Sequence, residues 1–567
     1  MRFAASGLPD VAATSAATPA GREIMPTIPN GRAWLACACA AVLALMACGG
    51  GEKERGSGGM AVVSATTFPD FLDPAIAYSS LASQSLWTVY TPLLTYAHAG
   101  GTAGAQLIPG LADALPRISS DGRTYRLRLR SGLTYSDGTP VKASDFEHTI
   151  KRVLNLESGG SSYFLPIVGA EHYVKARRAS ADIAGITTDD PTGAITVRLE
   201  SPQGSFSNVL ALDFAGLVPG NTPFENLTRE PPPGVGPYRL DNVKLNRGYE
   251  LEKVRGFAVG SIRAARLDRI TVRIVKNRRR QTQDAIDGKI DFMTDPPAPD
   301  QLRMVRDRFG GTRYREFGTA ATYFFFLNER VAPFHDVRVR RAVNHAIDRR
   351  AIPRLFGALL TPSCNFLPPD IKGYEKLEPC PYGDAPDLAK ARSLVRQAGV
   401  TGDEVAVYGT NEPESSSVVE HLADVLSDIG LKGRPRIIDG STYLATVGSQ
   451  RTKAQAGFVA FSADFPHPAN FTPLIDGRAI QATNSTNPGN VEDAQIDAAL
   501  VRASASADLD AVASEYAAVD RRLVEQAHIV PFGTRKLTVL YSDRIDAGRC
   551  TLWHPVYTVD LTKLCLR

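Results

Sequence analysis

The chain lacks the short motifs of several common enzyme classes. It contains no Gly-x-Ser-x-Gly nucleophile elbow, no His-Glu-x-x-His metal motif and no phosphate-binding Walker A loop. It also lacks a long basic run, and its net charge of +4 is small for 567 residues. These absences disfavour an enzyme of those classes, and the charge gives no argument for a nucleic-acid partner.

Metal-binding patterns are equally scarce. The nine histidines are scattered, and the seven cysteines include no Cys-x-x-Cys pair. A zinc site is therefore disfavoured. His335 and His345 lie ten residues apart, a spacing that allows either a metal pair or two solvated surface side chains. We expect no metal and no cofactor.

The N-terminal apolar run, Ala33–Ala47, is too short to span a membrane. It has 15 residues, whereas a transmembrane helix needs about 20. With Arg32 in front of it, the run is typical of a signal-peptide core. It ends in Leu-Met-Ala-Cys48, which resembles a bacterial lipobox, where a lipid is attached to the cysteine. The alternative is an ordinary secretory signal that is cut at a nearby alanine.

We therefore expect residues 1–47 to be a signal peptide, with Met25 as a second candidate start. Residues 48–60 would hold the lipidated Cys48 and a flexible Gly/Ser-rich tether. Residues 1–24 carry few charges and many Ala and Thr, which favours the later start.

Four cysteines remain once the signal peptide and the lipidated Cys48 are set aside, and an even number in an exported protein suggests disulfides. Four cysteines allow three connectivities, of which we favour the local one. Each bridge would close a loop of about 15 residues and stabilise the fold by roughly 3 kcal/mol. Buried free thiols are the alternative. The favoured pairs are Cys364–Cys380 and Cys550–Cys565.

Strand and helix patterns alternate along the chain. Alternation of apolar and polar residues predicts strands at 124–130, 194–200 and 270–275. Apolar residues at helical spacing predict helices at 144–154, 386–399 and 416–430. Ser144 and Glu147 also form a capping-box pattern at the start of the first of these helices. An α/β or α+β protein with several lobes follows.

One carboxylate stands out in the segment GFVAFSADFPHPANF, residues 457–471. Asp464 lies between aromatic and small residues, and no partner acid, base or nucleophile occurs at a recognisable spacing. A partly buried carboxylate must be paired. Its partner is either a cationic group of a ligand or an arginine of this chain, and spacing alone does not decide between them.

Several segments together resemble the solute-binding proteins of oligopeptide-type ABC importers, family 5. Pro109–Leu154 keeps a Pro-Gly-Leu-Ala start, an alternating strand, a Ser-Asp-Gly-Thr-Pro-Val turn and a following helix. Gly234–Leu240 resembles the Gly-x-Gly-Pro-Tyr turn of that family. FSADFPHPANF, which contains Asp464, resembles its small-Ala-Asp-aromatic turn. The resemblance runs in order over about residues 60 to 540.

The resemblance implies an α/β clamp of the periplasmic-binding-protein type (class II, cluster C), with mixed sheets and two main lobes plus an inserted third. Lobe I would comprise residues 61–90, 205–315 and 526–567, lobe II residues 91–204, and lobe III residues 316–525. The lobes would close over the solute by a hinge.

The implied function is binding without catalysis. The protein would be a lipid-anchored monomer in the periplasm or at the outer face of the cell membrane. It would capture an oligopeptide or peptide-like solute and deliver it to an ABC permease.

The resemblance also assigns site residues. Asp464 would pair with the α-amino group of a peptide, and Phe461 would pack along it. Backbone groups of Ala460 and Ser462 would pair with an extended peptide as a neighbouring strand does. The segment from Tyr78 to Ser80 would border the pocket. Simple packing is the alternative for each residue.

One expected feature is missing from this pattern. Some relatives place an arginine six residues before the aspartate to hold a ligand carboxylate, but Phe458 occupies that position here. Other solutes therefore stay open. A nickel-chelate or haem receptor would give a role to His335, His345 or His467, and an exported hydrolase with an unrecognised cleft is a further alternative.

Overall fold

The computed structural model describes residues 58–176, 181–383 and 385–567. The predicted signal peptide (1–47) and Cys48, the predicted lipidation site, lie outside these residues. Among the residues that are described, no helix combines the length and the apolar character that crossing a membrane requires.

The largest element in the described residues is a mixed sheet of 12 strands. Ten of them follow the order β16-β15-β17-β13-β18-β11-β1-β10-β9-β8, and β12 and β14 also pair with β18. The strands are β1 Met60–Ala65, β8 Tyr238–Lys244, β9 Gly248–Lys253, β10 Arg269–Ile274, β11 Phe292–Met293, β12 Tyr314–Gly318, β13 Ala321–Leu327, β14 Leu360–Pro362, β15 Glu404–Thr410, β16 Lys432–Ile438, β17 Ala456–Ser462 and β18 Ile529–Tyr541.

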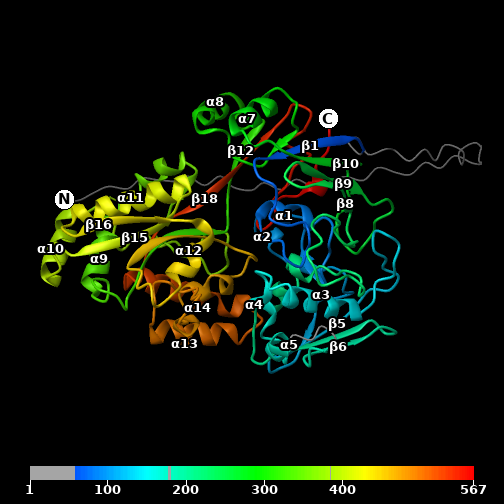
Figure 1. Cartoon of the computed structure of the whole chain (residues 1–567), viewed down its shortest axis with the longest axis horizontal. Helices are drawn as coiled ribbons and strands as arrows, with labels where there is room; N and C mark the ends of the chain where they lie inside the picture. Colours follow the sequence, from blue (N-terminus) through cyan, green and yellow to red (C-terminus); the bar gives the residue numbers. More distant parts are fainter. Residues whose placement is uncertain (1–57, 177–180, 384) are drawn as a thin grey trace, which may run out of the picture. The chain divides into compact units, whose positions relative to one another are not determined.

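Strand β18 links the two halves of this sheet (Figure 1). Its residues up to Arg535 pair with β13 and β14. From Lys536 onward it pairs with β12, and its last two residues also pair with β11. The boundary between lobes III and I that is expected at residue 526 therefore lies just before a strand that pairs with both halves of the sheet.

Strand β13 is buried on both faces because helices cover each side. Tyr323 and Phe325 belong to a core with α9 Val337–Ala346, α10 Leu388–Ala398 and α11 Pro413–Asp428. Phe324 and Phe326 belong to another core with α12 Gly440–Val447, α13 Ala494–Ser504 and α14 Leu509–Glu525. A strand covered on both faces reads as a continuous apolar run, as this one does.

A second, antiparallel sheet has the strand order β4-β5-β7-β6. Its strands are β4 Arg117–Ile118, β5 Thr124–Arg128, β6 Ile186–Asp189 and β7 Ala194–Arg198. In β5, Tyr125 and Leu127 are buried while Arg126 and Arg128 are exposed, as the alternation predicts. Their core also contains residues of α3 Ser144–Asn155 and α4 Ser161–Phe164.

The remaining elements are short. They are α1 Ser80–Leu86, β2 Leu94–Tyr96, α2 Gly101–Gly104, β3 Leu107–Pro109, α5 Ala170–Ala176, α6 Phe206–Val209, α7 Arg278–Ile286, α8 Pro299–Phe309, β19 Trp553–His554, β20 Thr558–Val559 and the 3-10 turns η1 Asp213–Ala215, η2 Ile352–Phe356, η3 Pro468–Asn470, η4 Thr472–Leu474, η5 Gly477–Ala479 and η6 Leu561–Lys563.

The predicted helices are present, but the capping box at the start of α3 is wrong. The N-cap is Ala143, and no side chain caps this helix. Ser144 instead uses its backbone N–H and its hydroxyl to donate to Asp190, at 2.8 and 3.0 Å. Glu147 accepts a hydrogen bond from the backbone of Ile183. Tertiary partners from a distant turn therefore replace the local capping bonds.

Two disulfides are formed, and their pairing is the local one favoured above. Cys364 joins Cys380, and Cys550 joins Cys565. Cys550 and Cys565 are fully buried beside β18, in the same core as Val539 and Tyr541. The second bridge therefore holds the C-terminal segment against the end of this strand.

A buried ion pair connects the N-terminal segment to α3. Both terminal guanidinium nitrogens of Arg152 donate to Asp73, at 3.0 and 2.8 Å, and the two side chains are 1% and 0% exposed. Backbone N–H groups of Ala75 and Leu227 also donate to this carboxylate. Such a pair holds α3 in position because neither charge has access to water.

Candidate ligand-binding site

The six residues proposed from the sequence as ligand contacts line one cavity of about 1050 Å³. They are Tyr78, Ser80, Ala460, Phe461, Ser462 and Asp464. Pockets for small molecules range from about 300 to 1,000 Å³, so this cavity can take a solute at the large end of that range. The structure thus brings together segments that lie 386 residues apart in the chain.

Asp464 is held by three uncharged donors. The hydroxyl of Tyr163 makes a short hydrogen bond to it, the hydroxyl of Tyr78 lies at 3.1 Å, and the amide of Asn470 lies at 3.4 Å. Burial raises the pKa of Asp464, and these hydrogen bonds lower it by less. In the described part of the chain, no arginine, lysine or histidine forms an ion pair with this carboxylate. The intramolecular salt bridge considered above is therefore not formed.

The donors are themselves fixed by local structure. Asp70 accepts hydrogen bonds from the backbone of Tyr78 and from the backbone and hydroxyl of Ser79, at 2.7 to 3.0 Å. Ser79 then caps α1 by accepting from Ala82. This turn directs the Tyr78 ring toward the cavity, where it stacks on Phe214 with ring centroids 5.9 Å apart.

Strand β17 presents a free edge to the cavity. Ala463 donates to Ala320, the residue before β13, so residues in register with it, such as Phe461, direct their backbone groups toward β13. By alternation, Ala460 and Ser462 direct theirs to the other side. There β15 pairs with β17 only at Ala456 and Gly457. The backbone groups of Ala460 and Ser462 therefore lie beyond the pairing with β15, and both residues are exposed.

The side chain of Phe461 packs against the hydrophobic core as well as lining the cavity. It is half-buried and packs edge-on against Phe471, with ring centroids 5.3 Å apart. Phe458 occupies the position where an arginine could have bound a ligand carboxylate. Its ring is buried against Tyr323 and Phe532. It adds no charge to the cavity.

Sequence reasoning missed several residues of this cavity. Tyr163 lies in α4, 301 residues before Asp464, and no local pattern links the two. Asn470 lies only six residues after Asp464 and accepts a hydrogen bond from the backbone of Asp464 at 2.7 Å. This short spacing in the sequence could have identified Asn470 as a site residue. Asp213 and Phe214 also line the cavity and carry no motif.

The histidines considered for a metal have other surroundings. His467 is buried, accepts from the backbone of Ala469 and packs on Tyr516, and burial lowers its pKa to about 4. His345 packs on Tyr382, and burial lowers its pKa too. The described residues contain no group of three or more His, Cys, Asp or Glu side chains that could hold a metal ion.

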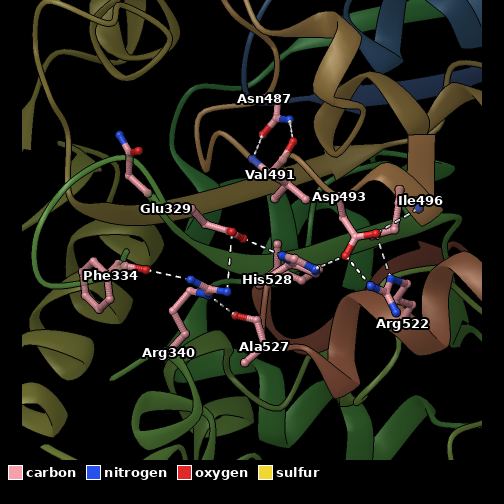
Figure 2. A network of polar contacts seen from close by, with 12 residues as sticks. Glu329, Phe334, Arg340, Asn487, Val491, Asp493, Ile496, Arg522, Ala527 and His528 are labelled. Atoms are coloured by element: carbon pink, nitrogen blue, oxygen red, sulfur yellow. Dashed lines mark hydrogen bonds and ion pairs between the residues drawn. The ribbon is translucent and has the colours of Figure 1, made fainter. Parts of the chain in front are cut away.

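Residues 481–488 form another wall of the cavity, and the polar network drawn in Figure 2 holds the end of this loop. Asn487 exchanges two hydrogen bonds with the backbone of Val491, at 2.9 and 3.0 Å. Next in the chain, Asp493 binds Arg522 through two bonds of 2.8 and 2.7 Å, and His528 lies between Asp493 and Glu329. The network ties the loop to α14 and to the start of β18.

The charge balance of this network favours the ionised form of Asp493. Burial pushes the pKa of Asp493 upward, but hydrogen bonds from Arg522 and from the backbone of Ile496 and Gln495 outweigh it and lower the pKa to about 2. Asp493 therefore stays ionised across the physiological pH range.

Comparison with known proteins decides the family. The family described as "Bacterial extracellular solute-binding proteins, family 5 Middle" matches residues 106–482. The chain belongs to this family. The resemblance noted in the sequence is thereby confirmed, as is the mixed α/β fold of its periplasmic binding proteins.

Individual family 5 proteins are moderately similar to the chain. The glutathione-binding protein GsiB of Shigella flexneri is 25% identical over 342 residues, which are 59% of this chain and 62% of that protein. The same protein from Shigella dysenteriae is 23% identical over 76% of this chain and 81% of its own. The chain thus spans less than two thirds of the first of these relatives.

Solved family 5 structures share the fold over most of the chain. Clavulanic acid biosynthesis oligopeptide binding protein 2 is 26% identical with a TM-score of 0.82, covering 90% of this chain and 96% of that one. The Escherichia coli murein tripeptide binding protein MppA is 20% identical with a TM-score of 0.69, covering 89% and 98%.

Proposed function

We propose that this family 5 protein binds a peptide or peptide-like solute through its α-amino group and delivers it to an ABC permease without altering it. The observation that carries the proposal is Asp464, a largely buried carboxylate of the cavity whose partners among the described residues are all uncharged. Ionising a buried carboxylate costs free energy unless a positive charge is nearby. A ligand ammonium group would supply that charge.

The free edge of β17 supports an extended ligand. A peptide lying along Ala460 and Ser462 would find backbone N–H and C=O groups that are directed away from β13 and lie beyond the pairing with β15. Main-chain pairing of this kind binds a peptide whatever its side chains are, and the surrounding cavity then sets the side-chain preference.

We further propose that the protein works outside the cytoplasm, held to the membrane by a lipid on Cys48. Lobe III would close over the solute against lobes I and II by bending where the chain passes between the sheet halves. Those passes are Thr319–Ala320, between β12 and β13, and Arg535–Lys536 within β18. The number of connections is small, which suits a hinge.

A ligand screen tests the proposed function. We expect free-amine tripeptides to raise the melting temperature, whereas their N-acetylated forms do not, because a ligand that binds only the folded state stabilises it by about 2.7 kcal/mol at 100 times its Kd. Native mass spectrometry of the purified protein should show a retained solute that is recovered chemically unchanged.

Glutathione is an informative member of that screen. Two relatives are named for binding it, and it carries an α-amino group together with two carboxylates. None of the described residues that line the cavity here is a lysine, arginine or histidine. We therefore expect glutathione to bind more weakly than a free-amine tripeptide amide, which has no carboxylate. The absence of a melting shift with every peptide would refute a peptide ligand.

Closure itself can be tested at Gly204. Its backbone N–H donates to Ser504 at 2.8 Å, and a Cβ atom added there would lie 1.7 Å from the carbonyl oxygen of Ser506. Gly204→Val should force the loop between α13 and α14 away. Overpacking costs roughly 1–3 kcal/mol, so we expect affinity to fall about 5- to 150-fold, measured by calorimetry with the best peptide.

The matched control is Gly548→Ala. A Cβ there meets only the Asp546 carboxylate at 3.5 Å, an ordinary contact, so affinity should stay at the wild-type value. If Gly204→Val binds as tightly as wild type while remaining folded, the contact between Gly204 and Ser506 has no role in ligand retention.

A further inference from the structure

A second buried carboxylate, Asp213, lines the cavity that contains Asp464. It begins the turn η1, far from Asp464 in sequence, and only 6% of the residue is exposed. Its neighbour Phe214 stacks on Tyr78, whose hydroxyl donates to Asp464. The two carboxylates therefore flank one aromatic pair in the wall of the same cavity.

The carboxylate of Asp213 lacks a full set of hydrogen-bond donors among the described residues. Its Oδ1 atom is buried and has no hydrogen-bond partner in the described residues. A hydrogen bond from the Ser83 side chain lowers its pKa, but burial raises it by more, to about 7. The hydroxyl groups of Tyr96 and Tyr557 lie close by but donate to other acceptors. Tyr96 donates to Asn208, and Tyr557 donates to the backbone of Ala211.

The cavity also offers no internal counter-charge. Its described lining contains these two aspartates and no lysine, arginine or histidine. An unpaired buried carboxylate is costly, and two of them without a cation make the site complementary to positive charge. An apolar or anionic ligand group placed against Asp213 would leave this cost in place.

We propose that Asp213 is a second cation-binding position and that the preferred solutes are dications, namely peptides with a free α-amino group and a lysine or arginine side chain. The proposal rests on the proposed function, in which Asp464 takes the α-amino group. Asp213 takes the side-chain ammonium or guanidinium group, and a charge-assisted hydrogen bond forms at each end of the ligand.

Calorimetry on matched tripeptide amides tests this assignment. Alanine tripeptides with a single lysine at position one, two or three are compared with the same peptides carrying norleucine, which has a similar chain and no charge. We expect the best lysine peptide to bind about 10- to 100-fold more tightly than its norleucine partner. Asp213→Asn should abolish this preference, so that the lysine and norleucine peptides bind with equal affinity.

Two controls separate Asp213 from other effects. Asp464→Asn should weaken lysine and norleucine peptides equally. Asp307→Asn, which removes a carboxylate that is 73% exposed, should change neither. If wild type binds peptides without preferring lysine, or if Asp213→Asn keeps the preference, the second cation position is refuted while the proposed function stands.

Binding of small amines tests the dication site independently of the proposed function. If no peptide binds, the proposed function fails. Asp213-dependent binding of 1,4-diaminobutane over butylamine would then still support the dication site, and equal or absent binding of both amines would refute it.

A pH series on wild type needs no variant. Cation binding favours the ionised form of Asp213, so the lysine preference should be lost below about pH 7 and reach a plateau above it. The titratable rings near Asp213 have pKa values outside this range. Burial raises the pKa values of Tyr96 and Tyr557 and lowers that of His554, which packs on both rings, to about 4. Burial also raises the pKa of Asp464, and the norleucine peptide reports its titration separately. A lysine preference that is constant from pH 5.5 to 8.5 would contradict the assignment.

Discussion

Replacing Asp464 by asparagine is expected to weaken binding of free-amine peptides by one to two orders of magnitude. The substitution removes a charge-assisted hydrogen bond worth roughly 1.5–3 kcal/mol and keeps the shape of the side chain. Tyr78, Tyr163 and Asn470 can still donate to the amide oxygen. Isothermal titration calorimetry with the best free-amine peptide gives the change in Kd.

The stability of the same variant separates binding from folding. Because burial raises the pKa of Asp464 in the folded protein, the folded state binds the proton more tightly than the unfolded state does. Ionisation at neutral pH therefore costs stability. We expect the ligand-free Asp464→Asn protein to melt at or above the wild-type temperature at pH 7. Unaltered affinity for every free-amine peptide would exclude Asp464 as the binding partner of the amino group.

Replacing Arg152 by methionine is expected to lower the free energy of unfolding by about 3–5 kcal/mol. The variant leaves Asp73 fully buried with no positive charge beside it, although the backbone of Ala75 and Leu227 still donates to it. Pro223 and Glu225 also lose the donors that Arg152 gives to their carbonyl groups. Urea unfolding followed by circular dichroism measures the change.

A surface pair provides the matched control for Arg152. Lys175 and Glu171 form an i,i+4 ion pair whose side chains are 76% and 67% exposed. Exposed pairs contribute little, so Lys175→Met should change stability by no more than about 1 kcal/mol. A loss at Arg152→Met as small as that of Lys175→Met would show that the buried pair does not hold α3 in place.

Local patterns predicted three strands and three helices of this protein, and the structure has an element of the expected type at each of them. The strand at 124–130 appears as β5, and the helix at 386–399 appears as α10, with Asp387 as its N-cap and Gly399 in the left-handed conformation at its end. The capping box at Ser144 failed because Asp190, which is distant in sequence, accepts both hydrogen bonds from Ser144. A motif read locally cannot anticipate a competing long-range partner.

Part of the candidate site was also predictable. Asp464 and its neighbours on β17 lie in one continuous motif, and Tyr78 follows a second one, so the resemblance located both. Tyr163 and Asp213 belong to no motif and reach the cavity only because the segments that carry them fold against β17 and α1. Their contribution is a matter of three-dimensional proximity.

The amino-acid sequence by itself indicated the family, the strands and helices that have a clear local pattern, and Asp464 as a candidate ligand contact, because those features depend on residues close together in the chain. Only the tertiary structure decided that Asp464 has uncharged partners, that β17 has a free edge and that Asp213 shares the cavity. Burial and pairing of a charge depend on segments hundreds of residues apart, and folding alone brings them into contact.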